Sequence, residues 1–201
     1  FEDYLFGPPE EEMDFLPILT EEDGSEEDDI EYGNEYPLVP LRNMVLFPGV
    51  ILPITVGRDK SIKAIKAAYK KDRLVAVVGQ VDGGVEEPEE VDLYRIGTIA
   101  KIVKMLKMPD GTTTVILQGK KRFRISELLS DDPFFLAKTE VLDDAQPSDL
   151  KNFEAVISSM HDLAKDVIEL SPQIPTEAGI VLKNIQSPAF LVHFIASILS
   201  A

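Results

Sequence analysis

The sequence predicts an α+β fold, in which a barrel-like β domain with one helix is preceded by an acidic tail and followed by the start of a helical bundle. Between residues 36 and 145, proline and glycine interrupt short apolar runs, which is typical of strands. After Pro147, apolar residues recur every three or four positions, which is typical of amphipathic helices. We therefore expect an acidic tail over 1–35, a β domain over 36–145 and a helical segment over 146–201.

The tail carries most of the net charge of −16. The first 36 residues contain 15 of the 36 acidic side chains and no basic one, which leaves 21 acidic against 20 basic residues in the remainder. Self-repulsion and a small apolar area predict a flexible tail. Apolar residues around Phe15 and Ile18 leave a second interpretation open, in which part of the tail docks on its own body or on a neighbouring chain.

Several strands and one helix are expected in the first half of the β domain. Runs at 38–41, 44–47 and 50–56 contain or adjoin prolines, which confines them to edges, bulges or bends and favours a barrel over a flat sheet. Over 59–71, apolar residues recur at helical spacing and lysines lie on the other side, which predicts an amphipathic helix. The aliphatic run 74–78 indicates a central strand that is buried on both faces.

The second half of the β domain is expected to contain a long hairpin. Two β-prone runs, 93–108 and 112–125, are joined by the turn sequence Pro109-Asp110-Gly111. Residues 134–142 supply a last strand.

Three helices are expected after the β domain. Ser148 is placed to cap a long helix, and Thr176 and Ser187 mark two further helix starts. The last helix, 189–199, is apolar nearly all round, so we expect more chain or another subunit to cover it. Because the first residue is Phe and no stop signal follows this helix, we expect the chain to be part of a longer protein.

Four segments resemble one family in the same order. The sequence YPLVPLRNMVLFPGVILPI at 36–54 closely resembles the opening of the amino-terminal domain of Lon proteases, and 56–61, 96–100 and 117–125 are similar to the same family. The resemblance implies a PUA-like β-barrel and a helical bundle that leads into an ATPase module and a serine-lysine protease module. It also implies that this region engages unfolded or tagged protein substrates, helps to organise a homo-hexamer and works in the cytoplasm.

Catalytic machinery is not expected in this chain. Lys121 follows Gly119-Lys120 where a phosphate-binding loop needs Ser or Thr, and only two histidines, His161 and His193, are present. Without cysteine, they do not form a recognisable metal site. We expect no cofactor here, with ATP and Mg²⁺ bound by other modules of the parent chain. No apolar run is long enough to cross a membrane, and no signal peptide is recognisable.

Protein substrates would require exposed apolar surface, and flexible methionine side chains suit varied partners. Each candidate for such a surface is more readily interpreted as a core residue, and hydrophobicity alone does not separate a groove from the interior. The candidates are Met44, Leu46, Phe47, Met105, Met108, Phe134 and Phe135.

A second group of candidates is basic and lies along the predicted hairpin. We call it the basic ribbon, and it comprises Arg95, Lys101, Lys104, Lys107, Lys120, Lys121, Arg122 and Arg124. It is interpreted as a solvated strand face, as a surface for the acidic tail in cis or in trans, or as a nucleic-acid site. The main hypothesis is a substrate-recognition and hexamer-organising domain of a Lon protease that degrades misfolded, damaged and selected regulatory proteins. The alternative is a free-standing PUA-like module that binds nucleic acid.

Overall fold

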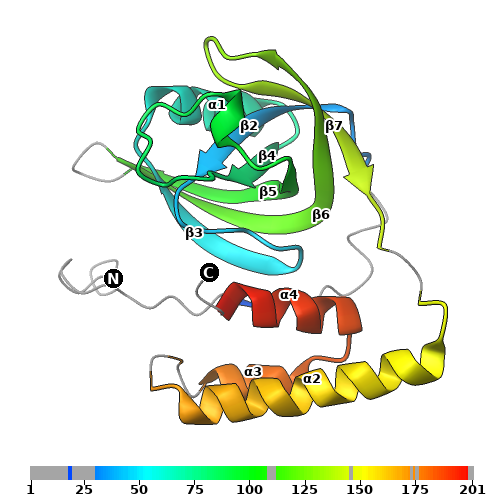
Figure 1. Cartoon of the computed structure of the whole chain (residues 1–201). Coiled ribbons are helices and arrows are strands. Elements are labelled where there is room, and N and C mark those ends of the chain that lie inside the picture. The colour runs from blue at the N-terminus through cyan, green and yellow to red at the C-terminus, as the bar shows by residue number, and fades with distance from the viewer. Residues whose placement is uncertain are drawn as a thin grey trace.

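The structure, a computed structural model, describes residues 18–19, 30–107, 112–144, 147–172, 174 and 177–198. It has a mixed α+β fold, in which a strand-rich body lies above three helices (Figure 1). The elements in chain order are β1 (Ile18–Leu19), β2 (Glu35–Leu41), β3 (Val50–Val56), α1 (Asp59–Lys70), β4 (Leu74–Gly79), the short 3-10 helix η1 (Glu90–Asp92), β5 (Ile96–Lys107), β6 (Thr113–Ser130), β7 (Leu136–Leu142), α2 (Leu150–Leu170), α3 (Glu177–Asn184) and α4 (Pro188–Ile198).

The sheet closes on itself through its longest strand. Its order is β1-β3-β6-β5-β4-β2-β7, and β7 also pairs with β6, so that five strands form a closed ring. β6 achieves this by pairing with β3 and β5 along its first part and with β7 further on, with register shifts after Ile125 and Leu128. Such irregularities bend a strand and increase its twist, which ring closure requires. β4 lies between β5 and β2 in the ring and is buried along its whole length, as predicted.

The predicted hairpin is confirmed, whereas the predicted strand at 44–47 is wrong. β5 and β6 pair in antiparallel register up to Lys107 opposite Thr113, while the turn at 109–111 lies outside the described residues. Residues 44–47 form no strand, because the chain turns at both ends, with φ of 49° at Asn43 and 79° at Gly49. The Leu46 carbonyl instead accepts a hydrogen bond from the Thr98 hydroxyl at 2.6 Å.

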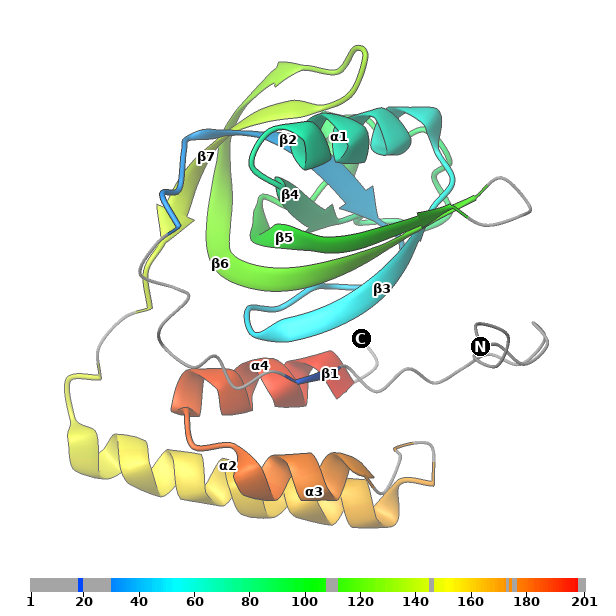
Figure 2. The same cartoon turned by 180° about the vertical axis from the view of Figure 1, so that it is seen from behind.

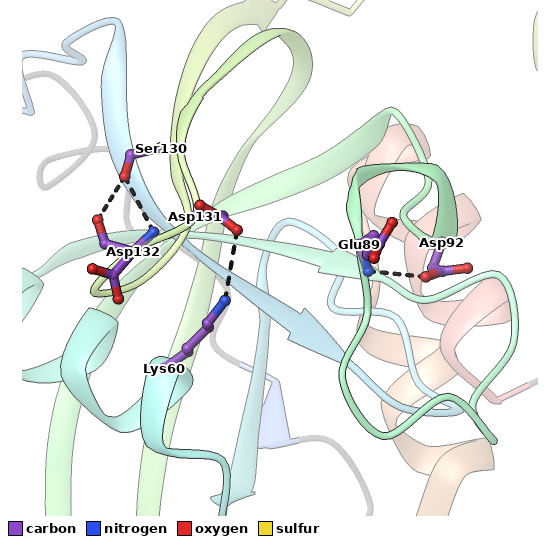
Figure 3. Close-up of polar contacts among 6 residues, drawn as sticks. All are labelled: Lys60, Glu89, Asp92, Ser130, Asp131 and Asp132. Carbon is purple, nitrogen blue, oxygen red and sulfur yellow. Dashed lines mark hydrogen bonds and ion pairs between the residues drawn. The ribbon is translucent and has the colours of Figure 1, made fainter.

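The connection between β6 and β7 is fastened to α1. Figure 3 shows the Lys60 ammonium group pointing at Asp131, with 3.8 Å between Nζ and Oδ2, and the same ammonium lies 5.5 Å from the centre of the Phe135 ring. In the same connection, the Ser130 hydroxyl donates a hydrogen bond to the Asp132 carbonyl at 2.6 Å. These contacts hold α1 beside the strands, where its buried Ala64, Ile65 and Ala68 join the core.

The long helix α2 starts as predicted, but its cap is Asp149 and not Ser148. The Asp149 carboxylate accepts a hydrogen bond from the Asn152 backbone amide at 3.2 Å. Both residue types cap helices well, so the sequence did not separate the two neighbours. Ser187 caps α4 as predicted, because its hydroxyl accepts from the Phe190 amide at 3.3 Å, whereas Thr176 lies outside the described residues.

The apolar helix α4 is covered in part by this chain itself, while its Val192 is 42% exposed, so the expectation that further chain or another subunit covers the rest of the helix stays a prediction. Both views place α4 between β3 on one side and α2 with α3 on the other (Figures 1 and 2). Leu191 and Phe194 are buried with the apolar residues of α2 and α3. On the opposite side, the Phe190 ring packs against Gly49 in the loop before β3. The strand body and the helices are thereby joined through one element.

Candidate functional site

The structure separates the predicted apolar candidates. Leu46 and Phe135 are 2% and 5% exposed and belong to the core, while Met105 and Phe134 are half-buried against it. Phe47 is also half-buried, with its ring stacked on His193 of α4 at a centroid distance of 5.8 Å. Met108 lies outside the described residues. Met44 is the candidate that the structure exposes, at 39%.

Met44 belongs to an apolar surface that the sequence did not reveal. Val45 and Tyr94 are 50% and 53% exposed, and a side chain of each approaches Gly79 at the end of β4. A Cβ atom placed on Gly79 would lie 3.4 Å from the Tyr94 ring, 3.8 Å from a Val45 methyl group and 3.8 Å from the Met44 carbonyl. These are ordinary van der Waals distances, so the loop 42–47 and the segment before β5 meet at Gly79.

Further exposed apolar side chains lie on the same segments. A backbone bridge joins Gln80 to Leu93, and the Val81 amide donates to the Asp92 carbonyl at 2.8 Å. The Asp92 carboxylate in turn accepts from the Glu89 amide at 2.9 Å (Figure 3), which fixes the short helix η1. We use the name Tyr94 patch for the exposed apolar residues that these segments carry, of which Val45 and Tyr94 meet at Gly79; its members are Met44, Val45, Val81, Val91, Tyr94 and Ile96.

Sequence reasoning missed most of this patch because its members are scattered. Val81, Val91 and Tyr94 stand singly among acidic and polar residues, with no periodicity that would mark one face. An available signal was the isolated position of Val81 and Val91 among glycine, proline and acidic residues, a composition that is typical of exposed loops. A group of exposed apolar residues of this kind is typical of surfaces that bind other proteins.

The basic ribbon is not a continuous positive surface. Lys120 is 3% exposed, because it is the extra residue of a bulge between the pairs Ile99–Lys121 and Ala100–Gly119. Three other members form ion pairs with carboxylates: Arg95 with Glu90 at 2.8 Å, Arg122 with Asp144 at 2.5 Å, and Arg124 with Glu140 at 3.7 Å. Lys104 and Lys107 are exposed, while Lys101 and Lys121 are half-buried. This arrangement favours the solvated-face interpretation of the ribbon.

The part of the acidic tail that is described pairs with β3 and not with the hairpin strands of the ribbon. Ile18 lies opposite Ile51, and Leu19 lies opposite Val50, in antiparallel register. A contact between the rest of the tail and the ribbon stays a prediction.

A cavity of about 440 Å³ lies where β6 and β7 approach the start of α4. Its lining carries both charges, since the Arg122–Asp144 ion pair lies beside Lys120 and His193. Burial lowers the pKa of His193, and the nearby Arg122 lowers it further, against the opposing effect of Asp144.

Neither a metal site nor a membrane span is found in the described part of the chain. No group of three or more His, Asp or Glu side chains there has the geometry to hold a metal ion. None of the described helices is both long and apolar enough to cross a bilayer.

These features define an α+β domain with an exposed apolar surface of the kind that contacts other proteins. The family follows from comparison with known proteins: a model of the substrate-binding domain of ATP-dependent protease La (LON) matches residues 35–201. The chain belongs to the Lon substrate-binding domain family.

Full-length relatives are substantially longer than this chain. It is similar to Lon protease of Cytophaga hutchinsonii, with 44% identity over 192 residues that cover 95% of this chain and 24% of the relative. It is equally similar to Lon protease of Flavobacterium johnsoniae, with 44% identity over 187 residues that cover 92% of this chain and 23% of the relative. The chain thus spans about a quarter of the length of these curated relatives.

A solved structure shows the same fold. The N-terminal domain of Mycobacterium avium complex Lon protease matches with a TM-score of 0.66 over 82% of this chain and 84% of that chain. Its sequence is 19% identical, so the likeness concerns the fold alone.

Proposed function

We propose that this chain is the substrate-recognition domain of an ATP-dependent Lon protease and that the Tyr94 patch holds apolar segments of unfolded proteins. Membership of the substrate-binding family supports the first half of this proposal. The observation that carries the second half is the meeting of Val45 and Tyr94, both about half exposed, over Gly79. Unfolded proteins expose the apolar side chains that folded proteins bury, so such a surface distinguishes the two.

Other modules of the parent protein would supply the chemistry. The proposal assigns ATP, Mg²⁺ and a serine-lysine pair to regions beyond this chain, and places the parent in the cytoplasm as a homo-hexamer that this domain helps to organise. The closed ring of five strands is compatible with the PUA-like barrel that the sequence predicts. The parent would degrade misfolded, damaged and selected regulatory proteins.

A comparison of two ligand classes tests the proposal. The 201-residue chain is titrated with a permanently unfolded, aromatic-rich polypeptide and, separately, with single-stranded RNA, each at low and moderate salt. Apolar contacts survive added salt, whereas phosphate contacts weaken steeply with it. We expect polypeptide binding that persists at moderate salt. RNA binding that falls with salt, without polypeptide binding, would contradict the proposal and support the alternative of a nucleic-acid module.

A further inference from the structure

A groove of about 520 Å³ lies between the end of β2, the second part of β3 and the start of α1. Its lining includes the apolar side chains of Leu41, Ile54 and Val56, together with Met44 at the border of the Tyr94 patch. Two guanidinium groups, those of Arg42 and Arg58, also line it. The groove therefore combines apolar surface with concentrated positive charge.

Both guanidinium groups bind uncharged partners. Arg58 donates to the Gln80 side-chain oxygen at 2.6 Å and to the Val85 carbonyl at 3.2 Å, and Arg42 donates to the Glu86 carbonyl at 3.4 Å. Neither arginine takes part in an ion pair with the described carboxylates. Burial and the charge of Arg42 lower the pKa of Arg58, against the opposing charges of Glu87 and Glu86. A carboxylate in the groove would relieve this repulsion.

The start of α1 at the end of the groove also favours negative charge. Arg58 occupies the N-cap position and provides no side-chain hydrogen bond to the first turn. The first amide groups of a helix lack intrahelical acceptors and carry a partial positive charge. An acidic side chain arriving there would accept from one of them.

β3 has two edges, and one of them leads into this groove. The opposite edge pairs with β6 from Ile51 to Val56 without a register shift. On the free edge, β1 pairs only with Val50 and Ile51, and no other described residue pairs with 52–56. An unpaired, regular strand edge is a template for another extended segment.

The register of β1 determines which residues would continue along this edge. Because Ile18 lies opposite Ile51 in antiparallel register, each step toward the N-terminus moves one residue further along β3. The sequence Met13-Asp14-Phe15-Leu16 then falls opposite residues 53–56, which line the groove. In the same register, Glu12 falls opposite Gly57 and Glu11 opposite Arg58.

The two prolines of these segments cost this pairing little. Pro17 would lie opposite Leu52, and Leu16 opposite Pro53. Successive residues of a strand direct their backbone groups to opposite edges, so only one of the two prolines removes a donor from the ladder between the segments. An edge strand tolerates a single missing donor.

We propose that residues 10–16 of this chain bind the groove in cis as a continuation of β1, with their apolar side chains along β3 and their carboxylates at Arg42, Arg58 and the start of α1. From Glu11 to Leu16, the order of carboxylates and apolar residues matches the order of partners along the groove, whereas Glu10 would fall opposite the acidic Asp59. This inference is independent of substrate recognition. It assigns a binding role to an acidic segment whose composition alone predicts a flexible tail.

Disulfide trapping tests the register, because the chain contains no cysteine of its own. The double variant Glu12→Cys/Gly57→Cys would place two Cα atoms opposite each other, at a separation that a disulfide spans. A side chain at Gly57 meets no atom within 4 Å, so this substitution fits the fold. Under mild oxidation we expect a rapid cross-link within one chain.

Gly33 provides a stringent control, because it is exposed and a Cβ atom there would make only an ordinary 3.9 Å contact with the Tyr36 hydroxyl. In Glu12→Cys/Gly33→Cys, the two cysteines are closer in sequence than in the test variant, so random encounter would cross-link them faster. We expect the test pair to react at least about tenfold faster than the control pair, because bound cysteines have a high effective concentration. Equal or faster reaction of the control pair would overturn the proposal, as would cross-linking mainly between chains.

The electrostatic part of the proposal has its own test. Arg42 is exposed and makes a single 3.4 Å hydrogen bond in the described structure, so Arg42→Glu should leave the thermal unfolding midpoint nearly unchanged. In the Glu12→Cys/Gly57→Cys background, we expect this reversal of charge to slow cross-linking several-fold. An unchanged rate would overturn the assignment of the tail carboxylates to these arginines.

Discussion

Gly119 allows the loop before β3 to cross β6 at close range. Its carbonyl accepts a hydrogen bond from the Gly49 amide at 3.0 Å, and its Cα faces the backbone of Phe47 and Pro48. A Cβ atom at this position would overlap the Phe47 carbonyl, which is backbone and does not move aside as a flexible side chain would. The loop carries Met44 and Val45 at its other end, so this crossing also positions part of the Tyr94 patch.

The first prediction follows from this contact. Gly119→Ala should lower the free energy of unfolding by about 1–3 kcal/mol, as overpacking of a close contact generally does. Denaturant unfolding measures the change. Gly57→Ala is the matched control, since its Cβ meets no atom within 4 Å, and its effect should stay within about 1 kcal/mol. Equal loss in both variants would show that the crossing is not tightly packed.

Single residues were also where prediction from sequence was weakest. Leu46 and Met44 stand two positions apart in one apolar run, yet one is buried and the other exposed. The Leu46 side chain packs into the core cluster, and its carbonyl accepts a hydrogen bond from Thr98, a residue far away in the sequence. Such long-range contacts leave no local pattern, so the sequence did not distinguish a core residue from a surface residue.

At the scale of elements, α2 depends on a cap at its first turn. Both carboxylate oxygens of Asp149 accept hydrogen bonds from Asn152, one from the backbone amide at 3.2 Å and one from the side-chain amide at 2.7 Å. Local periodicity predicted this helix well, and its residues Ile157, Ala164 and Ile168 pack against α3 and α4. Other apolar residues of the same helix are exposed, namely Leu150, Val156, Leu163, Val167 and Leu170. The prediction of a strand at 44–47 was wrong because the turns at Asn43 and Gly49 override the β propensity of these residues.

The second prediction concerns the residue that caps α2. Asp149→Ala should destabilise the chain by about 1 kcal/mol, because the first turn loses an acceptor for an amide group. The neighbouring Ser148→Ala, at a position without the capping bond, should change stability by less than about 0.5 kcal/mol. Urea unfolding followed by circular dichroism compares the two. A larger effect of Ser148→Ala would mean that Ser148 is the cap in solution.

At the scale of the whole molecule, α4 joins the strand body to the helices. The sequence predicted strands followed by helices, because periodicity changes after Pro147. The sequence favoured a barrel over a flat sheet, but it did not indicate that β6 closes the ring, because this closure depends on bulges and on pairing between distant strands. It also did not predict that α4 is covered in part within the chain, since a helix that is apolar all round shows the need for burial but not the partner.

The Tyr94 patch consists of residues from three segments of the chain. The loop 42–47, the end of β4 and the segment before β5 converge there, and none of the three would expose a continuous apolar surface alone. Recognition is therefore expected to depend on side chains from more than one segment, with the largest contribution from the aromatic Tyr94.

The most direct measurement is polypeptide binding by Val45→Ser/Tyr94→Ser, compared with the equally exposed control Val103→Ser/Leu129→Ser. Val103 lies seven residues along β5 from Ile96, about 23 Å from the patch. We predict that the patch variant binds an unfolded, aromatic-rich polypeptide at least about tenfold more weakly than the unchanged chain, a loss of ~1.4 kcal/mol or more, and that the control binds normally. Equal affinity of the patch variant and the unchanged chain would contradict the assignment of the Tyr94 patch as the substrate-binding surface.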